Sequence, residues 1–224
     1  MLDREKWQRI QELQKGKHFI SILHKPVEDF IVYLLYDLDF ISADHVSLIT
    51  YLLAFYVAYL FLRGAVLYAL LLAVIVGILD GVDGKIARLR GRKTYIGKLE
   101  HSIDMLYEQT WYATYTWYLW THYGDNLYLV LGFAFLILDS LVRHIYNTFW
   151  IATGKSLKYS GGLAEKVTKI DGRRSVYILH MIIWYVLGAF NYSIFTILIH
   201  CGATAFAYLA ISMKYLYSSQ VLPS

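Results

Sequence analysis

The 224-residue chain has a single cysteine, two prolines and few charged residues. With Cys201 alone, no disulfide can form within the chain, and no cluster of cysteine and histidine has the spacing of a zinc site. Linker-like stretches, low-complexity runs and internal repeats are also absent. We therefore expect one domain over residues 1–224, with a cytoplasmic or interfacial segment at 1–44 and a membrane bundle at 45–217. The amino-terminal stretch has no apolar core of signal-peptide length, so we expect no cleavage.

Charged residues make up only 17% of the chain, hydrophobic residues make up 58%, and the mean hydropathy is +0.43. This composition indicates an all-α integral membrane protein, because a helix satisfies its own backbone hydrogen bonds in lipid. About 20 apolar residues are needed per crossing, so the chain has room for six spans. We expect them at Val46–Leu62, Ala65–Leu79, Asp104–Thr121, Leu127–Ile151, Val176–Phe190 and Ser193–Tyr217.

Lysine and arginine residues lie on one side of these expected spans. Six precede the first span, six lie between Lys85 and Lys98, six lie between Lys155 and Arg174, and the opposite loops carry only Arg63. Because short cytoplasmic loops are enriched in positive charge, we expect both termini and the Lys85–Lys98 loop in the cytoplasm. The net charge of +4 is then explained by anionic lipid headgroups, and nucleic acid is not an expected partner.

The segment Arg4–Phe30 alternates charged residues with large apolar ones. This pattern predicts an amphipathic helix lying in the membrane interface before the first span, and an ordinary solvated helix is the alternative.

Carboxylates gather where the second and third expected spans meet. Asp80 and Asp83 lie on one face at the end of the second span, and Glu100, Asp104 and Glu108 lie on one face at the start of the third, because residues three and four apart share a helix face. Clustered carboxylates repel one another unless a cation holds them. A hard divalent ion with oxygen ligands, Mg²⁺ or Mn²⁺, is the natural candidate.

Two further residues of this region suit a phosphate ligand. Gly84 has no side chain, so a phosphate can approach the backbone, and Arg88 is a forked hydrogen-bond donor. Together with the acids they are typical of phosphoryl-transfer sites. The alternative is that Asp80, Asp83, Lys85 and Arg88 only form interfacial ion pairs that end a helix.

The residues Asp80-Gly-Val-Asp83-Gly84-Lys-Ile-Ala87-Arg88 resemble the first half of the CDP-alcohol phosphotransferase motif, Asp-x-x-Asp-Gly-x-x-Ala-Arg. In the second half, Gly-x-x-x-Asp-x-x-x-Asp, counting from Gly97 places His101 and Met105 at the acidic positions. A shift of one residue places Glu100 and Asp104 there. The result is similar to the Asp-His-x-x-Asp form of choline and ethanolamine phosphotransferases.

The resemblance implies transfer of a substituted phosphate from a CDP-linked donor to an alcohol, with release of CMP. It implies that Asp80, Asp83, Glu100 and Asp104 bind one or two metal ions and that Asp104 is the general base. It also implies a CDP site at Gly84, Ala87, Arg88, Asp44 and Ser47. Asp44 and Ser47 belong to Ser42-Ala-Asp44-His-Val-Ser47, which resembles the family's Thr-Pro-Asn element. A homodimer with six spans, cytoplasmic termini and a cytoplasmic active site is a further implication.

Several alternatives remain open at this point. The donor is CDP-diacylglycerol with a small alcohol, which a short chain of six spans favours, or CDP-choline or CDP-ethanolamine with diacylglycerol, which Glu100 and His101 favour. A non-catalytic scaffold is a rival because of the altered spacing after Gly97. A cation transporter is another, although transporters usually place their acids at the midplane of the membrane.

Other polar residues have both a structural and a functional interpretation. Asp139 and Arg143 are four residues apart, so they can pair with each other or line an acceptor pocket. The basic residues of Gly154–Arg174 follow the charge rule for a cytoplasmic loop or bind an anion. We expect His180 and His200 to be packed and hydrogen-bonded.

Overall fold

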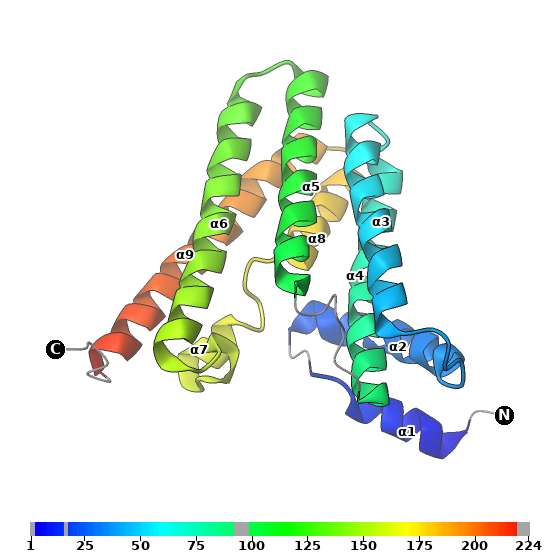
Figure 1. The fold of residues 1–224 in the computed structure, drawn as a ribbon. Coiled ribbons are helices and arrows are strands. Elements are labelled where there is room, and N and C mark those ends of the chain that lie inside the picture. Colours follow the sequence, from blue (N-terminus) through cyan, green and yellow to red (C-terminus); the bar gives the residue numbers. More distant parts are fainter. Residues whose placement is uncertain (1–2, 16–17, 92–98, 219–224) are drawn as a thin grey trace. The chain divides into compact units, whose positions relative to one another are not determined.

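The computed structural model describes residues 3–15, 18–91 and 99–218, and it is helical (Figure 1). Its α-helices are α1 (Arg4–Glu12), α2 (Phe19–Leu35), α3 (Ala43–Leu62), α4 (Val66–Arg90), α5 (Glu100–Tyr123), α6 (Leu127–Thr153), α7 (Gly162–Val167), α8 (Arg174–Val186) and α9 (Ser193–Ser218), with short 3₁₀ turns η2 (Leu157–Tyr159) and η3 (Phe190–Tyr192). The chain divides into two compact units, Met1–Tyr115 and Thr116–Ser224.

The first unit is built around α4. α3 runs antiparallel to α4, and α2 crosses its carboxyl-terminal end, with α1 packed on α2 (Figure 1). A core cluster joins the four helices and consists of Ile10, Val32, Ala43, Val46, Val82 and Ile86. Because Val82 and Ile86 belong to the acidic region of α4, this core holds that region directly.

Within residues 3–15, 18–91 and 99–218, four helices are long and apolar enough to cross a membrane. They are α3, α4, α6 and the segment Phe190–Tyr217, and they agree with four of the six expected spans. The chain is therefore an integral membrane protein. The expected spans Asp104–Thr121 and Val176–Phe190 are not confirmed. α5 has sufficient length but carries acids and hydroxyls along it, whereas α8 is apolar but has only 13 residues.

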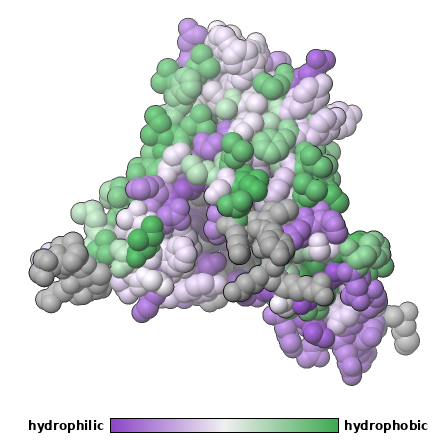
Figure 2. Space-filling view, in the orientation of Figure 1, coloured by the Kyte–Doolittle hydropathy of each residue, from purple (hydrophilic) through white to green (hydrophobic). Residues whose placement is uncertain are grey.

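The expected interfacial helix Arg4–Phe30 is two helices, α1 and α2. Leu13 is the C-cap of α1, and His18 caps α2, since its Nδ1 accepts a hydrogen bond from the Ile20 backbone N–H at 3.2 Å. The two helices differ in character. Hydrophilic residues cover α1 in Figure 2, whereas α2 exposes Phe19, Ile22, Leu23, Val27, Phe30 and Leu34.

The second unit packs α6 and α8 against α9. α6 ends where Gly154 adopts a left-handed conformation with φ 66°, which glycine tolerates better than other residues. Phe135 of α6 meets Tyr177 of α8 edge to face, with ring centroids 4.9 Å apart. Both aromatic residues are fully buried.

Candidate active site

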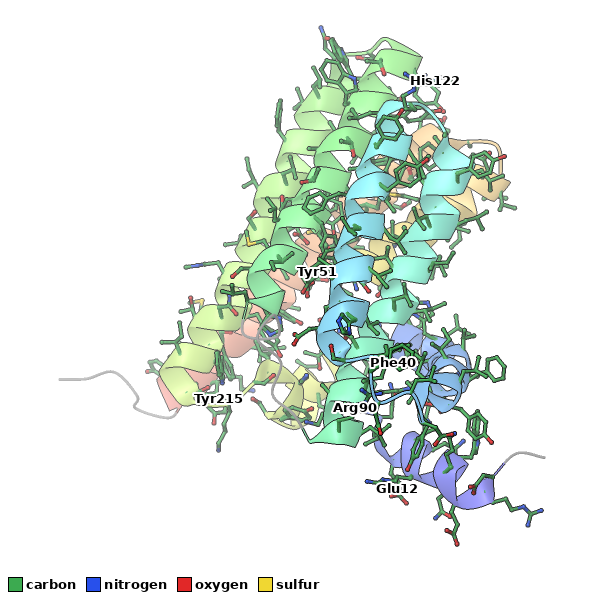
Figure 3. All side chains as sticks on the ribbon, turned by 45° about the vertical axis from the view of Figure 1, so that its right-hand side comes forward. Glu12, Phe40, Tyr51, Arg90, His122 and Tyr215 are labelled. Atoms are coloured by element: carbon green, nitrogen blue, oxygen red, sulfur yellow. The ribbon has the colours of Figure 1, made fainter. Side chains whose placement is uncertain are left out.

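Asp80 and Asp83 lie in the carboxyl-terminal part of α4, directly after the hydrophobic run of the helix. Gly91 ends the helix in a left-handed conformation with φ 60°. Arg88 and Arg90 occupy the last turn, where positive charge suits the helix dipole. Arg90 also donates to the carbonyls of Leu38 and Asp39 at 2.6 and 2.9 Å, next to Phe40 (Figure 3). The end of α4 is thus tied to the loop that precedes α3.

Ser47 of α3 and Asp83 of α4 meet in the interior. The Ser47 hydroxyl donates to Asp83 Oδ2 at 2.6 Å, and each residue is only 6% exposed. A hydrogen bond to an ionised carboxylate is short and strong, so Ser47 sets the direction of the Asp83 carboxylate. The sequence predicted both residues for the site, but it did not predict their contact.

The first turns of α3 explain why Ser47 reaches this position. Ser42 caps the helix, because its hydroxyl accepts from the His45 N–H at 3.3 Å and the His45 ring accepts from the Ser42 N–H at 3.1 Å. This reciprocal capping box fixes where α3 begins. Asp44 lies in the first turn and is half-buried, and Ser47 follows one turn after Ala43.

Gly84 and Arg88 lie against each other on α4. A Cβ built on Gly84 would lie 3.1 Å from Arg88 Nη1, so the glycine makes room for the guanidinium group. Arg88 Nε donates to the Leu13 carbonyl at 2.9 Å, which connects α4 to the end of α1. Ala87 is half-buried and packs against the core cluster of the unit. These contacts give all three residues a structural role beside the predicted ligand role.

The face of α4 opposite Asp83 carries a buried charge cluster. An ion pair of Lys85 was one of the two interpretations of the sequence, but its partners on α2 were not predicted. Lys85 Nζ lies 2.8 Å from Glu28 Oε2 and 2.7 Å from Asp29 Oδ1, and Lys25 Nζ lies 2.8 Å from Asp29 Oδ2. Burial raises the pKa of the Glu28 carboxyl, while the Lys85 ammonium acts in the opposite direction and Asp29 and Asp80 add to the rise. The available signal was the presence of Lys25, Glu28 and Asp29 within a mostly apolar helix.

Asp104 lies near the start of α5, which packs against α3. The ring of Tyr51 on α3, labelled in Figure 3, contacts the ring of Tyr107 on α5, with centroids 6.2 Å apart. The Trp111 indole N–H donates to the Ala54 carbonyl at 2.6 Å. Ser47 precedes Tyr51 by one turn, and Asp104 precedes Tyr107 by about one turn. Since α3 and α5 run in the same direction in Figure 1, Asp104 lies at the level of Ser47.

Glu108, one turn further along α5, is buried at 6% exposure. The Tyr112 hydroxyl donates to its Oε2 at 3.4 Å. Glu108 is therefore part of the packed interior of the first unit.

The donor chemistry of the predicted metal site fits Mg²⁺ or Mn²⁺, because carboxylate oxygens suit these ions. The hydroxyl of Ser47 on Asp83 is the kind of contact that orients a metal ligand. The Glu100 side chain lies outside the described residues. Among the side chains that are described, no three of His, Cys, Asp and Glu are grouped closely enough to hold a metal ion. The structure therefore does not group Asp80, Asp83 and Asp104 as a metal site within the described side chains, and the four-ligand site stays a prediction.

In the second unit the expected local pair forms. Arg143 Nε lies 2.7 Å from Asp139 Oδ2, and Asp139 is 2% exposed. His180 and His200, expected to be packed and hydrogen-bonded, bond to each other at 3.1 Å, and His200 also contacts the Ile170 carbonyl at 2.8 Å.

The basic loop of the second unit neutralises part of its own charge. Arg173 Nε donates to Asp171 Oδ1 at 2.7 Å, and the Tyr208 hydroxyl also donates to Asp171. Asp171 is 5% exposed, so Arg173 contributes to the folding of this loop whether or not the loop binds an anion.

Comparison with protein families matches residues 40–209 to CDP-alcohol phosphatidyltransferase. The matched range includes all nine residues from Asp80 to Arg88 as well as Glu100 and Asp104. A comparison with curated proteins finds no match.

Proposed function

Because the chain belongs to the CDP-alcohol phosphatidyltransferase family, we propose that it transfers a phosphatidyl group from CDP-diacylglycerol to the hydroxyl of a small polar alcohol. The family consists of transferases of substituted phosphate groups that act in phospholipid synthesis and typically depend on a divalent metal. The observation that carries the proposal is the family match across the Asp80–Arg88 motif. The short chain supports CDP-diacylglycerol as the donor.

In the proposed reaction the acceptor oxygen attacks the phosphorus that carries the diacylglycerol group. A bond forms from that oxygen to phosphorus, and the bond from phosphorus to the oxygen of CMP breaks. Asp104 takes the hydroxyl proton as general base, and CMP leaves with the electron pair of the broken bond. The half-buried position of Asp104 at the start of α5 supports this role.

Asp80, Asp83, Glu100 and Asp104 would hold Mg²⁺ or Mn²⁺, one ion or two. A bound divalent ion would neutralise charge on the pyrophosphate and on the departing CMP. Ser47 supports this arrangement, because its hydrogen bond at 2.6 Å orients the Asp83 carboxylate. We assign Gly84, Ala87, Arg88, Asp44 and Ser47 to the CDP-binding site. Arg88 would donate hydrogen bonds to a phosphate group of the CDP moiety.

We further propose that the two units act as one membrane-embedded domain of six crossings, with α5 and α8 as the additional crossings. The excess of lysine and arginine in three segments supports cytoplasmic termini and a cytoplasmic active site. The exposed apolar side chains of α2 support a position in the membrane interface. A homodimer is proposed from family membership alone.

The test is CMP release by the purified full-length protein in detergent with Mg²⁺ or Mn²⁺. CDP-diacylglycerol and CDP-choline are offered separately, each with a panel of acceptors. We expect release only when metal, CDP-diacylglycerol and an acceptor are all present. Release from CDP-choline with diacylglycerol would instead identify the reverse arrangement of donor and acceptor, which the Glu100-His101 pair favours.

Two matched variants complete the experiment. Asp104→Asn should reduce turnover by at least about 100-fold, in line with loss of a general base. Asp125→Asn is the control, because Asp125 is an exposed acid in the loop between α5 and α6, and it should retain activity. Equal activity of the two variants would contradict the role of Asp104, and no release from either donor by folded protein would contradict the proposed substrates.

A further inference from the structure

The helix that carries the metal-binding acids is held from two opposite sides. Residues two apart in an α-helix point about 200° apart around its axis, so Asp83 and Lys85 point in nearly opposite directions. Asp83 meets Ser47 of α3, and Lys85 meets Glu28 and Asp29 of α2. A rotation of α4 about its axis would break both sets of contacts.

The contact between α2 and α4 is close because glycines line it. A Cβ on Gly81 would lie 2.4 Å from the Glu28 carboxyl carbon, whereas a Cβ on Gly77 would lie 3.4 Å from His24 Cε1. Small residues allow two helices to approach in this way. Gly77, Gly81 and Lys85 are each four residues apart and form one stripe of α4. The Glu28 carboxylate packs against Gly81 and pairs with the Lys85 ammonium.

The charges of the cluster come from two helices and are deeply buried. Lys85 is 1% exposed, Asp29 is 1% exposed and Glu28 is 4% exposed. Lys25 also pairs with Asp29, so two ammonium groups face two carboxylates. A buried ion pair adds little net stability compared with apolar residues of similar volume, but it can specify one relative geometry of the two helices. The feature that these pairs specify here is the rotation of α4 relative to α2.

We propose that Glu28, Asp29 and Lys85 are positioning residues that fix the rotation of α4 and so direct Asp80 and Asp83 toward the metal ion. The proposal rests on the proposed function, because it assumes that these two aspartates bind a divalent ion. None of the three residues needs to touch the metal or the substrate. Their effect passes through the backbone of α4, in which Lys85 follows Asp83 by two residues.

The test is Mn²⁺ binding by the full-length protein in detergent, followed through the electron paramagnetic resonance signal of free Mn²⁺. In Lys85→Met, loss of positioning should weaken Mn²⁺ binding by about 10-fold or more, the range seen when a residue supporting a metal ligand is removed. A simple charge effect has the opposite sign, because removing a cation near the site strengthens binding of another cation. Unchanged or tighter binding in Lys85→Met would therefore overturn the proposal.

The glycine stripe supplies a second pair of variants that leaves all charges in place. Gly81→Ala should push α2 away from α4 and weaken Mn²⁺ binding, whereas Gly77→Ala, at an ordinary contact distance, should leave binding within about 2-fold. This pair decides the question if Lys85→Met does not fold. Equal binding by the two alanine variants would count against the proposal.

Lys6→Met is the control for loss of a lysine, because Lys6 pairs with the exposed Asp37 at 2.7 Å. It should bind Mn²⁺ as the wild type does. If the wild type binds no Mn²⁺, the metal-dependent function itself fails and this proposal fails with it. If the wild type binds Mn²⁺ and all variants bind equally, only the positioning role is wrong.

Discussion

The first unit contains a long-range pair of buried charges beside the local pair of Lys25 and Asp29, whereas the charge pairs described in the second unit are local. In the first unit, Lys85 of α4 pairs with Asp29 of α2, 56 positions away. In the second unit, Arg143 pairs with Asp139 on the same helix, four positions away, and Arg173 pairs with Asp171, two positions away. A local pair neutralises a buried charge within one segment. A long-range pair also fixes two helices relative to each other, so the first unit uses its charges to set helix geometry.

The largest expected difference between the two kinds of pair is in stability. Lys85→Met should lower the free energy of unfolding by about 3–5 kcal/mol, because two buried carboxylates lose their shared cation. Arg143→Met should cost less, about 1–3 kcal/mol, because its side chain is 25% exposed compared with 1% for Lys85. Unfolding in a single detergent measures both, and equal losses would remove the distinction between local and long-range pairs.

Gly172 lies between the paired residues Asp171 and Arg173. Substituting it tests whether the segment that carries this local pair depends on packing against distant residues. A Cβ at Gly172 would lie 2.8 Å from the Tyr177 hydroxyl and 3.1 Å from Thr204 Oγ1, so Gly172→Ala should destabilise the protein by about 1–3 kcal/mol through overpacking. Gly202→Ala on α9 is the control, since an added Cβ there meets nothing within 4 Å. It should stabilise by about 0.5–1 kcal/mol. Thermal unfolding compares them, and a neutral Gly172→Ala would show that the loop adjusts.

The smallest expected effect concerns pH. Burial raises the pKa of Asp171 above its usual value of 3.8, although Arg173 and Tyr208 lower it in part. A carboxyl with a raised pKa in the folded state contributes stability below its unfolded pKa and loses that contribution as the pH rises through the folded value. The melting temperature of the wild type, measured relative to Asp171→Asn, should therefore fall as the pH rises from about 4 to 7. A difference that stays constant over this range would contradict the assignment.

Hydrophobic runs predicted the spans well where length and composition agree. α3, α4, α6 and α9 follow the expected runs, because an apolar segment of sufficient length forms a helix in any membrane protein of this kind. α5 and α8 were harder to predict, since α5 places acids and aromatics on a long helix and α8 ends after 13 residues. α5 has the length of a span without the apolar composition, and α8 has the apolar composition without the length.

Spacing also predicted those parts of the site that lie within one segment. The pairing of Asp139 with Arg143 follows from a separation of four residues, and the acids of α4 share a face for the same reason. The contact of Ser47 with Asp83 could not be derived in this way, because it joins two helices. The sequence marked both residues through their separate motifs, and the packing of α3 on α4 brought them together.

The sequence by itself determined the solvent in which the protein folds, four of its membrane helices, its family and the residues that carry the proposed chemistry. These features depend on composition, on short periodicities and on a motif of nine residues, all of which are local. Only the tertiary structure decided that Lys85 pairs with Glu28 and Asp29 and that Ser47 orients Asp83. The physical reason is that helix rotation and packing are set by contacts between distant segments, and no local pattern specifies which buried charges will meet.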